Sequence, residues 1–170
     1  MKITRIPLLI LFVTLLGLAL PARAETMSVP SKEKAAFTFD VPSDWKPKGD
    51  PNDESAEAGA PDDSAYVTAW MAAGDEKTFV KDLESTLKDS MKSIDPGHQE
   101  SEADQNGTHF HVITGSGVDK RTGSKVKFLV GIFPTGGGKV GIVYADYDAD
   151  AADSTMSVLK GILNSVKVKK

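Results

Sequence analysis

Residues 37–45 read FTFDVPSDW and hold the pattern that decides the fold. In this stretch Phe37, Phe39 and Val41 alternate with polar residues, which is the period of a strand with one buried face. The proline that follows ends the strand, because its ring nitrogen has no hydrogen to donate to a neighbouring strand. We therefore predict a half-buried strand that begins near Ala36 and places two phenylalanines in a core.

Downstream of this strand, the spacing of apolar residues changes between two residues, typical of a strand, and three to four residues, typical of a helix. A second strand is predicted at 66–73, and Asp75 is a good N-cap for a helix whose apolar residues recur at helical spacing as far as Ile94. Three strands with short connections predict an antiparallel meander, because parallel neighbours would need a crossover. The predicted meander strands are 108–114, 125–133 and 140–147, with 98–107 as a weak edge strand and a helix opened by Asp150 or Asp153 at the end.

Apolar residues stand at even positions in both strands of the first hairpin, 108–114 and 125–133. We therefore predict that even positions share one buried face and that odd positions form a mixed outer face. The polar residues expected together on that outer face are His109, His111, Lys125 and Lys127. Small residues there leave room for a close-packed helix or for a shallow groove, namely Gly131, Gly141 and Ala145.

The element order predicts an α+β fold built on an antiparallel β-sheet. The stretch 37–45 resembles the N-terminal signature of the PsbP/Mog1-like superfamily, in which an aromatic-rich strand runs into Pro and then Trp. The downstream order of elements is also similar over residues 36–168. The resemblance implies an α/β/α sandwich, with helices flanking the sheet, that serves mostly as a binding or accessory module and not as an enzyme.

The first 24 residues have the pattern of a secretory signal peptide. Lys2 and Arg5 precede an apolar run from Leu8 to Leu20, and the small-x-small triplet 22–24 follows. We therefore expect cleavage after residue 24 and a periplasmic or extracellular protein. Residues 25–35 are polar and predict a flexible N-terminal arm, and residues 36–170 predict a single domain.

Charge and cysteine content narrow the function classes. Removal of the leader takes away three basic residues and leaves 17 basic against 24 acidic residues, a formal net charge of −7. This charge argues against nucleic acid as a partner, because a nucleic-acid binder needs a basic face, and it argues against an anionic membrane. The chain has no cysteine, so disulfides and thiolate metal sites are excluded. A second apolar span of membrane length is absent, so we expect a soluble product.

Candidate chemistry is sparse. His109 and His111 point the same way on a strand and could share a metal ion, but the sequence identifies no third ligand, and we expect no cofactor. The alternating aspartates that begin at Asp146 resemble a calcium loop, but they lack the glycine and the glutamate that such a loop needs. No elbow or triad pattern supports a nucleophilic enzyme.

The segment 43–64 is acidic and is predicted to be a long loop. Trp45 at its start either anchors a partner, as tryptophans often do, or folds back on the core. The leading hypothesis is an exported non-enzymatic module that contacts a protein or envelope component through this loop and the mixed face. The possible interaction surface comprises Trp45, Asp62, Asp63, His109, His111 and Lys127. The alternatives are a metal-binding protein or hydrolase centred on the two histidines, and a small-ligand carrier, which would need an apolar pocket.

Overall fold

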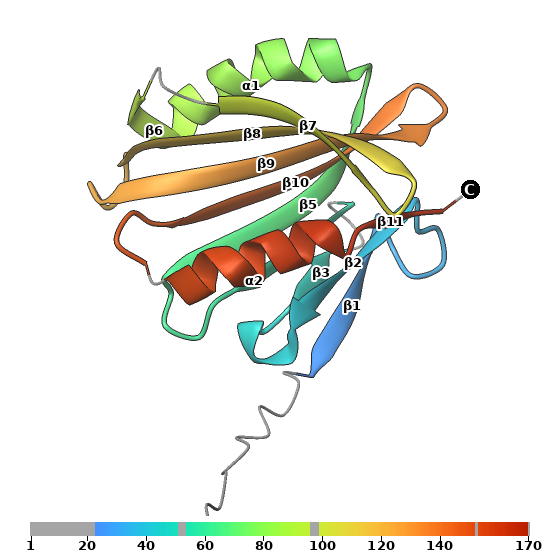
Figure 1. The fold of residues 1–170 in the computed structure, drawn as a ribbon, viewed down its shortest axis with the longest axis horizontal. Coiled ribbons are helices and arrows are strands. Elements are labelled where there is room, and N and C mark those ends of the chain that lie inside the picture. The colour runs from blue at the N-terminus through green and yellow to red at the C-terminus, as the bar shows by residue number, and fades with distance from the viewer. Residues whose placement is uncertain (1–22, 51–53, 96–98, 152, 170) are drawn as a thin grey trace, which may run out of the picture.

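A computed structural model describes residues 23–50, 54–95, 99–151 and 153–169 (Figure 1). Its main sheet has eight strands in the order β3-β4-β5-β10-β9-β8-β6, with β7 also paired to β8. All the strand pairs in it are antiparallel. The strands are β3 (Lys48–Asp50), β4 (Ser55–Gly59), β5 (Ala65–Ala73), β6 (Met91–Ile94), β7 (Gln99–Gln105), β8 (Thr108–Asp119), β9 (Lys125–Gly136) and β10 (Lys139–Asp148).

A smaller sheet and two α-helices complete the described fold. The smaller sheet has the order β1-β2-β11, with β1 (Ala24–Val29), β2 (Phe37–Pro42) and β11 (Lys167–Val168). A short 3-10 helix, η1 (Ser43–Trp45), follows β2. The α-helices are α1 (Glu76–Ser90) and α2 (Asp153–Asn164), and neither is long and apolar enough to cross a membrane.

Both faces of the main sheet are buried, on opposite sides, by different elements (Figure 1). On one face, Leu83 and Leu87 of α1 pack over Phe128, Val130 and Ile132 of β9. The other face is covered by α2 together with the small sheet. Its core comprises aromatic and aliphatic side chains that include Phe37, Phe39, Phe110, Phe133 and Leu159.

The predicted antiparallel sheet is confirmed, and so is the strand at 37–42. The predicted flanking layers are confirmed in part, because most of the described chain is strand and the small sheet shares one layer with α2. The predicted cap of α1 is present, since the Asp75 carboxylate accepts a hydrogen bond of 2.9 Å from the backbone nitrogen of Thr78. Met91 and Ile94, predicted to continue that helix, lie instead in β6.

The expected flexible arm at 25–35 is wrong for its first residues. Ala24 to Val29 form β1, which pairs with β2 along its whole length. Met27 and Val29 are 7% and 0% exposed. They stand two residues apart, so both side chains point to the buried face of the strand. The predicted signal peptide lies outside the described residues except for Arg23 and Ala24, and Ala24 begins β1.

The long acidic loop predicted at 43–64 is also corrected. Within it the chain forms η1 and then the β3–β4 hairpin, which extends the main sheet beside β5. Ala56 and Ala58 are buried, at 0% and 2% exposure. Alanine has low strand propensity, which hides this strand in the sequence, but its small side chain fits the close approach of the small sheet. Glu57, the one acidic residue of β4, therefore points away from that core.

The predicted face assignment of the β8–β9 hairpin is wrong. His111 pairs with Ile132 and Val112 pairs with Gly131, so an odd position in one strand always faces an even position in the other. Side chains of directly paired residues lie on the same face. His111 therefore shares the α1 face with Ile132, whereas Lys127 alternates with Leu129 on the α2 face.

Candidate functional site

The residues that the sequence singled out do not form one surface. Trp45 is only 5% exposed and belongs to the core between the main sheet and α2. Of the two alternatives for Trp45, the structure therefore has the side chain folded back on the core, and Trp45 is not available on the surface as an anchor for a partner. Asp62 and Asp63 are exposed in the turn between β4 and β5. Lys127 lies on the other side of the sheet from the histidines, and the predicted mixed face is therefore absent.

The two histidines have different partners. Nδ1 of His111 lies 2.9 Å from Oε1 of Glu76, at the start of α1. Nδ1 of His109 lies 2.9 Å from Oδ1 of Asp104 on β7, and this hydrogen bond raises the pKa of His109. Among the described residues no group of three potential ligands is placed to hold a metal ion.

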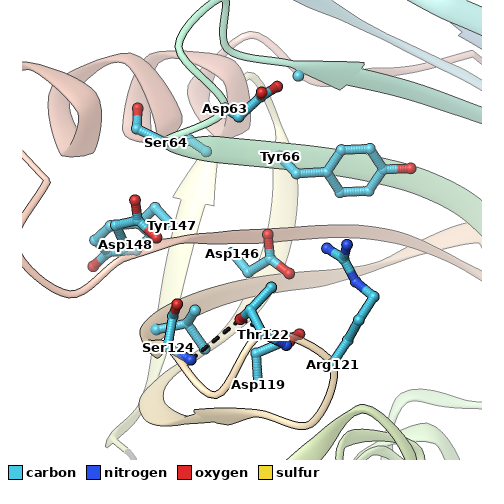
Figure 2. Close-up of a pocket in the computed structure, with 13 residues that line it drawn as sticks. Asp63, Ser64, Tyr66, Asp119, Arg121, Thr122, Ser124, Asp146, Tyr147 and Asp148 are labelled. Atoms are coloured by element: carbon cyan, nitrogen blue, oxygen red, sulfur yellow. Dashed lines mark hydrogen bonds between the residues drawn. The ribbon is translucent and has the colours of Figure 1, made fainter.

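A polar cleft opens where the β4–β5 turn, the β8–β9 turn and the end of β10 meet (Figure 2). Its volume is about 690 Å³. Its charged lining consists of Asp63, Asp119, Arg121, Asp146 and Asp148. Four aspartates thus face one arginine, and we call this site the acidic cleft.

Backbone hydrogen bonds hold the walls of the acidic cleft together. The backbone nitrogen of Asp148 donates to the carbonyl of Ser64 over 2.9 Å, which ties the end of β10 to the β4–β5 turn. Within that turn, the Asp62 carboxylate accepts from the backbone nitrogen and the hydroxyl of Ser64, at 3.1 and 2.7 Å. These hydrogen bonds lower the pKa of Asp62 and fix the turn that presents Asp63. Asp62 itself supports the wall and is not part of the lining.

The β8–β9 turn is fixed in a similar way. Oδ1 of Asp119 accepts hydrogen bonds from the backbone nitrogen and the hydroxyl of Thr122, at 2.6 and 2.9 Å, and these bonds lower the pKa of Asp119. Gly123 adopts a φ of +75°, a left-handed conformation that glycine reaches without strain. Figure 2 shows the Arg121 side chain extending from this turn alongside Asp146 toward β5.

Asp146 lies at the centre of the acidic cleft, on β10 between the two turns (Figure 2). Its carboxylate accepts a hydrogen bond of 3.3 Å from the hydroxyl of Tyr144. Partial burial raises the pKa of Asp146, and the negative charges of Asp119 and Asp148 raise it further. Burial also raises the pKa of Tyr66 across the cleft, whose hydroxyl donates to Glu57. The neighbouring tyrosine hydroxyls therefore remain protonated donors and add no negative charge to the cleft.

Sequence reasoning found parts of the acidic cleft but not the whole. Asp63 was a candidate within the acidic segment, and Asp146 and Asp148 were noticed as an incomplete calcium loop. Asp119 and Arg121 carried no signal, because Asp is an ordinary residue of a hairpin turn and a single nearby Arg marks no site by itself. These residues meet only because β5, β10 and β9 are neighbours in the sheet.

The arrangement suits binding better than bond-making chemistry. Carboxylates and hydroxyls that surround an open cleft accept hydrogen bonds and attract positive charge. The acceptor groups of the lining side chains are spread along the cleft and do not converge on one point, as the ligands of a metal ion would. The site therefore has the features of a docking surface for cationic groups.

Comparisons with known proteins concern the fold. No protein-family model matches the sequence, and no curated protein sequence matches it either. The solution structure of cyanobacterial PsbP (CyanoP) from Synechocystis is similar with a TM-score of 0.60 and 11% identity, over 87% of this chain and 94% of that one. A crystal structure from Bacteroides thetaiotaomicron gives a TM-score of 0.55 and 13% identity, over 86% of this chain and 48% of that one.

LpqN, a protein involved in cell envelope biogenesis of Mycobacterium tuberculosis, has a TM-score of 0.43 and 18% identity, over 88% of this chain and 82% of that one. At identities this low, structural similarity shows that the chains share a fold, and it does not show that they share functional residues. The similarity to CyanoP confirms the resemblance that residues 37–45 carried. The chain has a PsbP-like fold.

Proposed function

We propose that the protein is an exported, non-enzymatic accessory module that docks a basic segment of a partner protein in the acidic cleft. The observation that carries the proposal is the set of four aspartates around an open cleft with a single arginine. A lysine or arginine side chain of the partner would enter toward Asp146 and pair with the surrounding carboxylates. Charge-assisted hydrogen bonds of this kind are among the stronger polar contacts in proteins.

The shape of the acidic cleft favours a side chain over a free ion. A volume of about 690 Å³ lies in the range of sites that hold drug-sized molecules, and it exceeds what one coordinated ion fills. The carboxylates approach from three separate elements and, within the described chain, form no group that could ligate a metal. A guanidinium or ammonium on a flexible stem can reach such dispersed carboxylates, because it does not require a closed coordination shell.

The charge of the whole chain supports the same choice. The expected exported form carries a formal net charge of −7, which attracts basic partners over distances of about a Debye length, roughly 8–10 Å at physiological ionic strength. Complementary charge raises association rates and suppresses wrong partners more than it adds affinity. We therefore expect a salt-sensitive and reversible interaction. The PsbP-like fold is compatible with this accessory role, but a fold alone does not identify the partner.

The alternative of an enzyme or metal site at His109 and His111 finds less support. Each imidazole has its own carboxylate partner, Asp104 for His109 and Glu76 for His111. Both carboxylates orient a ring within the fold, and they come from β7 and α1 and not from the cleft. A role in holding α1 and β7 against β8 accounts for both contacts.

The first prediction concerns basic peptides. A lysine- and arginine-rich peptide should bind the purified exported protein, and the combined change Asp63→Asn, Asp146→Asn and Asp148→Asn should weaken binding at least tenfold, a loss of about 1.4 kcal/mol or more. The reason is the removal of three carboxylates from the cleft. Titration calorimetry or fluorescence anisotropy at low and high salt measures the affinity, and the wild-type affinity should fall as salt rises.

A matched control separates the cleft from the overall charge. Asp44, Asp89 and Asp150 are exposed and do not line the acidic cleft. Their combined change to Asn alters the net charge equally and should reduce affinity less than twofold. Equal losses in the two triple variants, with both still folded by circular dichroism, would contradict docking in the cleft and indicate a diffuse charge effect.

A further inference from the structure

A second cavity lies between α2 and the strands β7, β8 and β9, on the face opposite α1. Its volume is about 750 Å³, within the range of sites that bind small organic ligands. We call it the α2 groove. Its lining includes Val112 of β8, Leu129 of β9, and Met156 and Leu163 of α2.

The floor of the α2 groove is apolar. Leu129 and Leu163 are 6% and 8% exposed and belong to the core, and Val112 and Met156 are half-buried at its margin. These apolar side chains are still partly exposed to water. A ligand that covers their remaining surface lowers the free energy of the complex. A flexible hydrocarbon chain is the simplest group that covers these apolar side chains.

The rim of the α2 groove carries the opposite charge to the acidic cleft. Lys127 of β9 and Lys160 of α2 line the groove and are exposed. Among the described residues neither ammonium group is paired with a carboxylate. Asp95, which accepts a hydrogen bond of 3.5 Å from the Ser116 hydroxyl, adds one negative charge to the lining. The groove thus presents a net positive rim on an acidic protein.

We propose that the α2 groove binds one molecule of a single-chain amphiphile with an anionic headgroup, of the lysophospholipid class. The acyl chain lies on the apolar floor, and the anionic group pairs with Lys127 and Lys160. A planar bilayer is a poorer match, because the groove is concave and its apolar residues lie below the lysines. An acidic peptide would meet the lysines but leave the apolar floor uncovered.

The probe is monomeric 14-carbon lysophosphatidylglycerol, and the comparison ligand is lysophosphatidylcholine with the same chain. Titration of the purified exported protein should give saturable one-to-one binding, at least tenfold tighter for the anionic lipid. The variant Lys127→Gln plus Lys160→Gln should remove this preference and leave the phosphatidylcholine analogue unaffected. The control variant Lys81→Gln plus Lys139→Gln changes two exposed lysines outside the groove and should keep the preference.

A third variant tests the floor. Thr114 lines the groove and is half-buried, so Thr114→Trp should fill the cavity and weaken both lipids at least tenfold. Lys127 and Lys160 are exposed, so their change to Gln should leave the protein folded. Thermal melting checks that each variant is folded. Three results would overturn the proposal: equal affinity for the two lipids, equal losses in the two lysine variants, or binding of phosphatidylglycerol vesicles or a glutamate-rich peptide without binding of the monomeric lipid.

Discussion

The carboxyl group of Asp146 lies where the fold partly excludes water. Burial raises its pKa above the unfolded value, and Asp119 and Asp148 act in the same direction. The folded state therefore binds this proton more tightly than the unfolded state does. By linkage, stability falls as pH rises from the unfolded pKa through the raised folded pKa, and the cost is fully present above that window.

We expect Asp146→Asn to stabilise the protein at pH 7. Asparagine keeps the acceptor for the Tyr144 hydroxyl and removes the charge that burial disfavours. The melting temperature of the variant should exceed that of the wild type at pH 7, and the two should converge well below pH 3.8, the ordinary Asp value. Asp44→Asn, at an exposed position outside the cleft, serves as the control. A variant that melts lower than the wild type at both pH values would contradict this account.

Two glycines predict opposite effects of the same substitution. A Cβ on Gly141 would overlap the ring of Phe133, which is paired beside it and fully buried. The ring cannot move away, so Gly141→Ala should destabilise the protein by about 1–3 kcal/mol. Gly161 lies in α2 with open space around it, so Gly161→Ala should stabilise by about 0.5–1 kcal/mol. Urea denaturation measures both, and equal signs would refute the steric explanation.

At the scale of elements, spacing in the sequence identified those whose residues repeat strongly. Phe37, Phe39 and Val41 predicted β2, and Asp75 predicted the start of α1. The β3–β4 hairpin was missed, because the two alanines and the glutamate of β4 give a weak strand signal. Strand β1 was missed because only Met27 and Val29 mark its buried face.

The pairing of elements was harder to predict than their existence. The apolar pattern of one strand predicts which of its residues share a face. The turn sets the register between two strands, and the register decides which residues of the next strand lie on that same face. Both faces of β8 and β9 are buried, so apolar residues at even positions of both strands did not have to lie together. The α1 face takes Ile132, whereas the α2 face takes Phe110. The acidic cleft and the α2 groove both depend on this register, and neither was predicted as a site.

At the scale of the whole molecule, one sheet joins two hydrophobic cores that have no helix in common. Strands of the main sheet contribute residues to both the α1 core and the core under α2. Tyr147 of β10 lines both the acidic cleft and the α2 groove, so the two proposed sites share a wall in this central sheet. Because β9 and β10 supply side chains to both cores, loss of either core removes support from the same strands.

The two tryptophans report separately on these cores. Trp45 is buried in the core under α2, whereas Trp70 packs on the α1 core with its ring 6.2 Å from Phe79. The single-tryptophan variants Trp45→Phe and Trp70→Phe should each unfold in urea in one transition, with circular dichroism and the remaining tryptophan giving coincident midpoints. Leu83→Ala, in the α1 core, should then lower stability by about 2–5 kcal/mol, as large-to-small core substitutions do. Its effect should shift the signals of Trp45 and Trp70 together, because the shared sheet couples them. A shift confined to Trp70 would mean that α1 and its core unfold independently of the rest.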